Sequence, residues 1–226
     1  MKNLALTRLL QLASPALPVG AYSYSQGLEA AVECGTVSDA AGAQRWIGDM
    51  LRLSMARLEA PVWRRLHAAW TDADIDQVQE WNDYFLATRE TAELRAETAQ
   101  MGWSLRRLFM DMGEFDAPSL AMLDAPDELA FPTAYTFAVA QWRIPERDAL
   151  TAYLWSWLEN QVMAALKAVP LGQTEGQRLL VALSPDIVII AEDESFMEEH
   201  EMTNYSHGLA IASSVHETQY SRLFRS

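Results

Sequence analysis

Several features are scarce in this 226-residue chain, and each scarcity excludes a class of protein. The single cysteine, Cys34, cannot form an internal disulfide or a cysteine-rich zinc or iron–sulfur module, so we expect a reducing, cytoplasmic setting. No apolar run reaches the roughly eighteen residues of a membrane-spanning helix, and no membrane association is expected. With 17 basic against 31 acidic residues, the net charge of -14 opposes binding to a nucleic-acid backbone.

The motifs of nucleotide binding and catalysis are missing as well. The pair Gly172 and Gly176 is followed by Gln177 where a phosphate-binding loop needs lysine. The stretch from Ser23 to Gly27 comes close to a serine nucleophile elbow, but a serine replaces its first glycine and no strand precedes it. The sequence therefore predicts neither a P-loop nucleotidase nor a serine hydrolase.

No firm metal site or other cofactor site is expected. None of the four histidines has a histidine or carboxylate three or four residues away, the spacing that puts two ligands on one helix face. The acidic stretch 192–201 includes His200 and is interpreted as a solvated helix end, with weak binding of a cation as the less favoured alternative.

Helical periodicity runs through most of the chain, whose residues are 50% hydrophobic, whereas the alternation typical of strands is scarce. We therefore predict an all-α fold over residues 1–226, a single compact domain of roughly nine to eleven helices. The apolar helix over 145–169 is expected to be central and buried. Other helices are expected at about 3–13, 25–34, 39–59, 62–70, 74–85, 88–112 and 173–183, from Ser184-Pro185-Asp186 onward, and from 205 to the end.

Charged residues dominate the start of the helix expected over 88–112. We predict that this face is solvated or meets a partner; its residues are Arg89, Glu90, Glu93, Arg95 and Glu97. The segment 113–131 carries Gly113, Pro118 and Pro126 and is expected to be a long connection.

Three segments carry a more specific signal. They are 10–29 (LQLASPALPVGAYSYSQGLE), 164–173 (AALKAVPLGQ) and 216–226 (HETQYSRLFRS). Together, in this order and over essentially the whole chain, they resemble the UreF family of urease accessory proteins.

The resemblance implies an all-helical adaptor without enzymatic activity or a cofactor of its own. Such a protein would bridge UreD, also called UreH, and the GTPase UreG in a chaperone complex on apo-urease. The complex would help to insert nickel into the urease active site, with GTP hydrolysis performed by UreG. The resemblance also implies a homodimer within this larger complex.

Physical roles can be assigned to residues of these segments. Pro18 and Gly20 are expected to shape a rigid loop that presents Tyr22 and Tyr24 to a partner, with buried structural tyrosines as the alternative. Lys167, the only internal lysine, is expected either to contact a partner or to extend its stem along an apolar surface.

The C-terminal segment 216–226 is predicted to become ordered on a partner, because chain ends fray unless they are held and aromatic and arginine side chains are common interface anchors. Leu223 and Phe224 would enter apolar pockets, and Arg222 and Arg225 would meet acceptors. The alternative is a tail folded onto its own core. The partner-binding residues expected in this segment are His216, Tyr220, Arg222, Leu223, Phe224 and Arg225.

A second functional hypothesis comes from another class. The aromatic residues Tyr153, Trp155 and Trp157 could line a cavity in which Glu159 acts as acid or base on a small molecule. An enzyme of this kind would show an enclosed pocket with a perturbed carboxyl group, whereas an adaptor would expose apolar patches.

Overall fold

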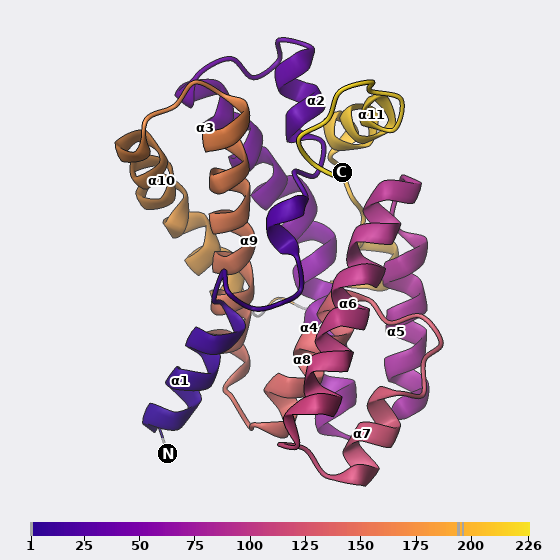
Figure 1. The fold of residues 1–226 in the computed structure, drawn as a ribbon. Coiled ribbons are helices and arrows are strands. Elements are labelled where there is room, and N and C mark those ends of the chain that lie inside the picture. The colour runs from indigo at the N-terminus through magenta and orange to yellow at the C-terminus, as the bar shows by residue number, and fades with distance from the viewer. Residues whose placement is uncertain (1, 194, 196) are drawn as a thin grey trace.

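The computed structural model describes residues 2–193, 195 and 197–226, and in this part of the chain it contains helices and no strands (Figure 1). The predicted all-α fold is thereby confirmed. The α-helices are α1 (Lys2–Leu12), α2 (Leu28–Glu33), α3 (Ala40–Met50), α4 (Ala60–Thr71), α5 (Ile75–Ala87), α6 (Ala92–Met112), α7 (Ala117–Leu123), α8 (Phe131–Gln141), α9 (Glu146–Ala168), α10 (Gln173–Glu192) and α11 (His207–His216). Short 3-10 turns cover Ala21–Ser23 and Glu199–Glu201.

Helix α9 is the central helix, as its apolar pattern predicts. It contacts α1, α2, α3, α4 and α10, and Leu150, Leu154 and Leu158 along it are fully buried. A second group of helices forms where α4 and α6 pack against α8 (Figure 1). Helix α11 lies beside α2, so the C-terminal part of the chain returns to the N-terminal part.

Local sequence signals explain several helix starts. The side chains of Asp39, Asp74, Thr91 and Asp116 each accept a hydrogen bond from a backbone N–H in the first turn of α3, α5, α6 and α7. Between α3 and α4 the chain stays helical through a π-helical segment, Leu51–Glu59. The helix therefore continues without a non-helical residue through Pro61, which lies in the first turn of α4.

The structure corrects the prediction of two helices around Pro185. Helix α10 runs without interruption from Gln173 to Glu192, with Pro185 inside it. Pro185 has no N–H to donate to the carbonyl of Val181. Val181 is 76% exposed, so water can take the place of this donor. Leu183 and Ile187 on the opposite face are buried in the core, and this packing outweighs the local break.

Three other expected boundaries were wrong. Helix α2 begins at Leu28, three residues after the predicted start, because Gln26 (φ 52°) and Gly27 (φ 76°) adopt left-handed conformations that an α-helix cannot include. The connection 113–131 contains the short helix α7. The last helix stops at His216, and residues beyond it form a non-helical tail.

Candidate functional site

The three segments that carry the sequence signal meet at one place in the fold. Lys167, near the end of α9, places its ammonium nitrogen 5.4 Å from the ring centroid of Phe224 and 6.0 Å from that of Tyr22. A cation at this distance from an aromatic face is attracted by the ring electrons. Lys167 is itself exposed, so it extends over these rings and keeps its charge in water.

The two tyrosines of the loop before α2 differ in exposure. Gly20 adopts φ +78°, which turns the chain after the exposed Pro18. Tyr22 is 67% exposed, whereas Tyr24 is buried and its carbonyl accepts a hydrogen bond from the Asn160 side chain at 3.1 Å. Burial, together with the nearby Glu97, raises the pKa of Tyr24, and Arg225 opposes this rise. Tyr24 is therefore structural, and Tyr22 is the tyrosine available to a partner.

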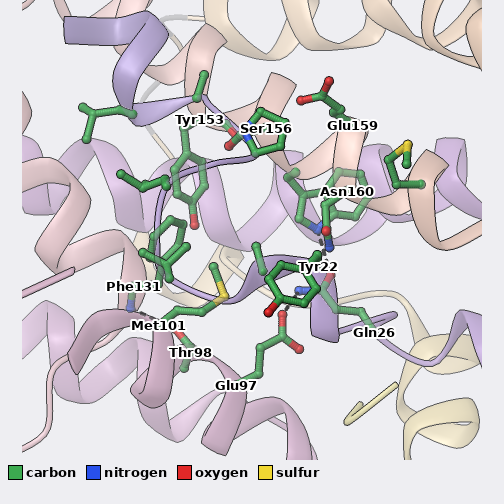
Figure 2. A pocket seen from close by; sticks show the side chains of 18 of the residues that line it. Tyr22, Gln26, Glu97, Thr98, Met101, Phe131, Tyr153, Ser156, Glu159 and Asn160 are labelled. Carbon is green, nitrogen blue, oxygen red and sulfur yellow. Dashed lines mark hydrogen bonds between the residues drawn. The ribbon is translucent and has the colours of Figure 1, made fainter. Parts of the chain in front are cut away.

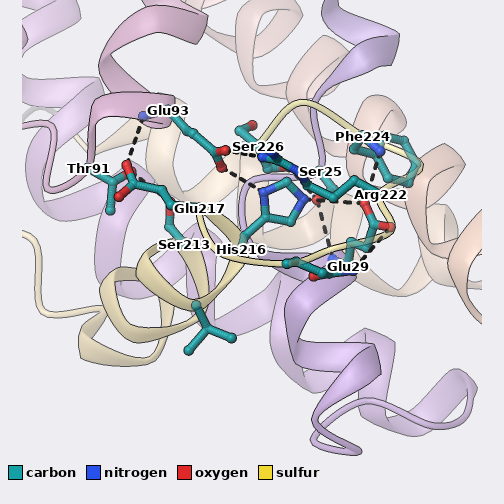
Figure 3. A network of polar contacts seen from close by, with 12 residues as sticks. Ser25, Glu29, Thr91, Glu93, Ser213, His216, Glu217, Arg222, Phe224 and Ser226 are labelled. Atoms are coloured by element: carbon teal, nitrogen blue, oxygen red, sulfur yellow. Dashed lines mark hydrogen bonds and ion pairs between the residues drawn. The ribbon is translucent and has the colours of Figure 1, made fainter.

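The tail beyond α11 is fastened to the body by a buried polar network (Figure 3). His216 is fully buried between two carboxylates: its Nδ1 lies 2.6 Å from Glu93 and its Nε2 lies 3.3 Å from Glu29. Arg222 also forms an ion pair with Glu93. A hydrogen bond between two charged groups, such as that of Arg222 to Glu93, is stronger than a neutral one.

Glu29, on α2, organises the backbone of the tail. Its carboxylate accepts the N–H of Leu223 at 2.7 Å and the N–H of Phe224 at 2.9 Å. Two successive amides thus bind one buried carboxylate. These bonds hold Phe224 against the core, and its side chain is 6% exposed.

Ser226 is held by the loop before α2 and by α6. The backbone N–H and the hydroxyl of Ser25 donate to the carbonyl of Ser226, at 2.9 and 2.5 Å. The hydroxyl of Ser226 donates to Glu97 at 2.7 Å, and Gln26 donates to the other oxygen of Glu97 at 2.7 Å. Burial raises the pKa of Glu97 to about 7, although these two hydrogen bonds oppose the rise.

The tail therefore lies on its own chain, and this differs from the expectation that Phe224 enters a partner's pocket. Phe224 is buried in its own core because the carboxylate of Glu29 accepts the N–H of Phe224 and the N–H of the preceding Leu223. Tyr220 is fully exposed and Leu223 is 70% exposed. Arg225 is exposed and donates its backbone N–H to the carbonyl of Ser23 at 2.8 Å.

A pocket of about 200 Å³ opens beside this network (Figure 2). Tyr153, Trp157 and Glu159 line it, as the enzyme hypothesis expects, but Trp155 lies outside the lining and is exposed. Burial raises the pKa of Glu159. The apolar part of the wall is formed by Leu12, Leu17, Val19, Leu94, Met101 and Phe131.

The buried ionisable groups of the pocket are paired with one another. The Tyr153 hydroxyl donates to Glu59, and the guanidinium of Arg89 lies 3.6 Å from the same carboxylate. Trp157 donates its indole N–H to Gln26 at 2.7 Å, which in turn holds Glu97. Such pairing is typical of groups that hold helices together. Glu97 and Glu159 are lining carboxyl groups whose pKa is raised by burial.

The described residues offer no group of three or more histidine, cysteine or acidic side chains placed to hold a metal ion. Of the acidic stretch 192–201, Glu194 and Phe196 lie outside the described residues. In the same part of the chain, no helix is long and apolar enough to cross a membrane.

The acids that hold the tail were not predicted from the sequence. Glu93 and Glu97 were assigned to a solvated or partner-facing surface, but Glu97 is 6% exposed and Glu93 contacts His216. Their spacing of four residues on α6 puts both on the face that meets the tail, and this was the available signal. Glu29 lies within the first segment but carried no assigned role.

Comparisons with known proteins identify the family of this chain. The family model described as UreF matches residues 37–184. A urease accessory protein UreF from Azoarcus sp. (strain BH72) is 60% identical over 228 residues, which cover 99% of this chain and 96% of the relative. Proteins of the same name from Dechloromonas aromatica (53% identical, covering 99% and 98%) and Methylobacillus flagellatus (50% identical, covering 100% and 99%) are also similar. The chain therefore belongs to the UreF family of urease accessory proteins.

Proposed function

We propose that this protein is a cytoplasmic adaptor of urease maturation, which bridges UreD (UreH) and the GTPase UreG on apo-urease and is required for the incorporation of nickel. It catalyses no reaction itself, and GTP hydrolysis belongs to UreG. Family membership and the name of its relatives as urease accessory proteins support this role.

One structural observation carries the proposal: an anchored tail that presents apolar side chains to solvent. Tyr220 and Leu223 are exposed although the residues around them are fixed by buried hydrogen bonds, and the exposed Tyr22 belongs to the loop that meets the same tail at Lys167. Exposed aromatic and aliphatic side chains on an ordered support are typical of interface anchors. We assign this surface, formed by Tyr22, Lys167, Tyr220 and Leu223, to a protein partner and take UreD as that partner.

A homodimer within the complex is part of the proposal. Helix α10 exposes Val181, Val188 and Ile189, whose spacing of seven and eight residues puts them on one side of the helix. Exposed apolar side chains on one helix face favour association between proteins.

Nickel-dependent activation of apo-urease tests the function. We expect that apo-urease supplied with UreD, UreG, nickel and GTP gains activity only when this chain is present, and that the chain co-purifies with both partners. A folded chain that captures neither partner would contradict the proposal and would favour the enzyme hypothesis built on the pocket.

The exposed tail residues give a sharper prediction. Replacing Tyr220 and Leu223 together with serine should abolish the capture of UreD while leaving the melting temperature within a few degrees of the parent, because surface substitutions usually change stability by about 0.5 kcal/mol or less. Pull-down and thermal melting measure the two effects.

The matched control is Trp103→Ser on α6, which removes an exposed aromatic side chain outside this surface. The control should capture UreD normally. Capture by the double variant at the level of the parent would show that the tail does not contact UreD.

A further inference from the structure

We propose that the pocket beside the tail binds a small organic cation, a primary amine with an aromatic or short aliphatic body, whose ammonium group contacts Glu97 (Figure 2). This ligand site goes beyond the adaptor role and does not rest on it. The pocket has a volume of about 200 Å³, which is less than the pockets that hold drug-sized molecules, so it suits a small ligand.

The first observation is a buried carboxylate in the wall of the pocket. Glu97 lines the pocket and is 6% exposed. Each of its oxygens accepts one hydrogen bond at 2.7 Å, one from Gln26 and one from Ser226, as an ionised carboxylate does. Both donors are neutral, and no lysine, arginine or histidine in the described part of the chain forms an ion pair with Glu97. A buried negative charge is costly without a cation, so it favours a cationic ligand.

The other charged groups of the pocket leave the charge of Glu97 uncompensated. Glu59 and Arg89 form a pair with each other at 3.6 Å, so their charges cancel. Lys167 is exposed over two aromatic rings, where water screens its charge, and Glu159 is half-buried. The lining therefore contains three acidic and two basic side chains, and the unpaired buried charge among them is negative.

The second observation is the aromatic character of the wall. Five aromatic side chains line the pocket, namely Tyr22, Phe85, Phe131, Tyr153 and Trp157. The indole N–H of Trp157 donates to Gln26, and Gln26 donates to Glu97, so this ring lies two hydrogen bonds away from the carboxylate. Aromatic faces attract cations, and aromatic cages are a common way to recognise ammonium groups. The wall thus combines the two features that an organic ammonium ion needs.

An organic cation fits this wall better than a metal ion does. Hard metal ions take about six or more oxygen ligands, and residues 2–193, 195 and 197–226 contain no group of three or more histidine, cysteine or acidic side chains placed to hold one. An ammonium group needs fewer acceptors. The apolar body attached to it would cover Leu17, Val19 and Met101, which also line the pocket, and remove them from water.

Ligand-observed NMR titration of the full chain tests the site, with phenethylamine and hexylamine as the probes. We expect both amines to bind at one site with a dissociation constant of about 10 µM to about 1 mM, the range of such small ligands. The neutral analogue phenethyl alcohol should bind about tenfold more weakly or less, because it lacks the charge that Glu97 attracts. A folded chain that binds neither amine, or that binds the alcohol as tightly as phenethylamine, would overturn the proposal.

Two acid-to-amide variants locate the ammonium group. Glu97→Gln keeps the shape of the side chain and removes its charge, so it should weaken amine binding by about tenfold or more and leave the affinity for the alcohol unchanged. Glu159→Gln is the matched control, because Glu159 also lines the pocket but is only half-buried, and it should change amine binding by about threefold or less. Amine binding that is unchanged in Glu97→Gln, or weakened more in Glu159→Gln, would contradict the contact with Glu97.

A third variant tests the pocket without altering Glu97 or its hydrogen bonds. Ser156→Phe adds a ring to the pocket wall at a half-buried position of α9. We expect it to exclude phenethylamine and phenethyl alcohol alike, while thermal melting shows that the chain is still folded. Phenethylamine that bound to this folded variant as it does to the parent would lie outside the pocket, and the proposal would fail.

Discussion

Gly102→Ala is expected to lower the free energy of unfolding by about 3 kcal/mol or more, although the same change inside a helix ordinarily adds about 1 kcal/mol. Gly102 lies in α6, where a Cβ would stand 1.9 Å from the carbonyl oxygen of Leu129 and 2.8 Å from the carbonyl carbon of Ala130. Both atoms belong to backbone that leads into α8, so no side-chain rotation can relieve the clash. Helices α6 and α8 must separate, and the packing between them is lost.

Urea unfolding measures this effect, and Gly172→Ala provides the control. A Cβ at Gly172 meets only the flexible Glu175 side chain at 3.8 Å, and its φ of -78° suits any residue. We expect the control to be neutral or slightly stabilising. Gly102→Ala would raise the stability if position 102 were exposed. That result would show that α6 does not lie this close to the segment before α8.

Asn82→Ala is expected to have an effect of similar size, about 3 kcal/mol of lost stability. The side chain of Asn82 is fully buried on α5 and connects three groups of the segment that begins α8. Its amide nitrogen donates to the carbonyl of Glu128, and its oxygen accepts the N–H of Ala130 and the hydroxyl of Thr133, each at 2.9 Å. Alanine leaves all three groups without this partner, and those of Ala130 and Thr133 lie away from water.

Thermal or urea unfolding checks this prediction, with Gln77→Ala as the control on the same helix. Gln77 is exposed and its side chain bonds only to neighbours on α5, Glu80 and Trp81. Its loss should cost about 0.5 kcal/mol or less. Equal effects of the two substitutions would show that Asn82 does not organise the start of α8.

The fold was accessible from the sequence where local signals and burial agree. The apolar pattern of α9 located the central helix, and Asp39 marked the start of α3. Local signals failed where tertiary contacts decide. Pro185 remained inside a helix because the faces of α10 differ in exposure, and the left-handed turn at Gln26 and Gly27 delayed α2 because α11 packs there.

The site was predicted in its segments but not in its contacts. The loop residues, Lys167 and the tail were singled out, and the structure brings them together. Glu29, Glu93 and Glu97, which hold the tail, were missed because a charged residue is ordinarily solvated. Their burial is favourable only with hydrogen-bond donors that lie far away in the sequence. Nothing near Glu93 in the sequence indicates that His216 will face it.

The hydrogen bonds of Ser25 to Ser226 join residues 201 positions apart, and this separation dictates the order in which the molecule is completed. During synthesis the loop that carries Ser25 leaves the ribosome long before Ser226, so these hydrogen bonds cannot form until the residues between have been made. Closing so long a loop costs conformational entropy, and this cost is offset only after the helices between have folded. Seating of the tail on the loop is thus a late step of folding, and the loop stays without these hydrogen bonds until the helices between are in place.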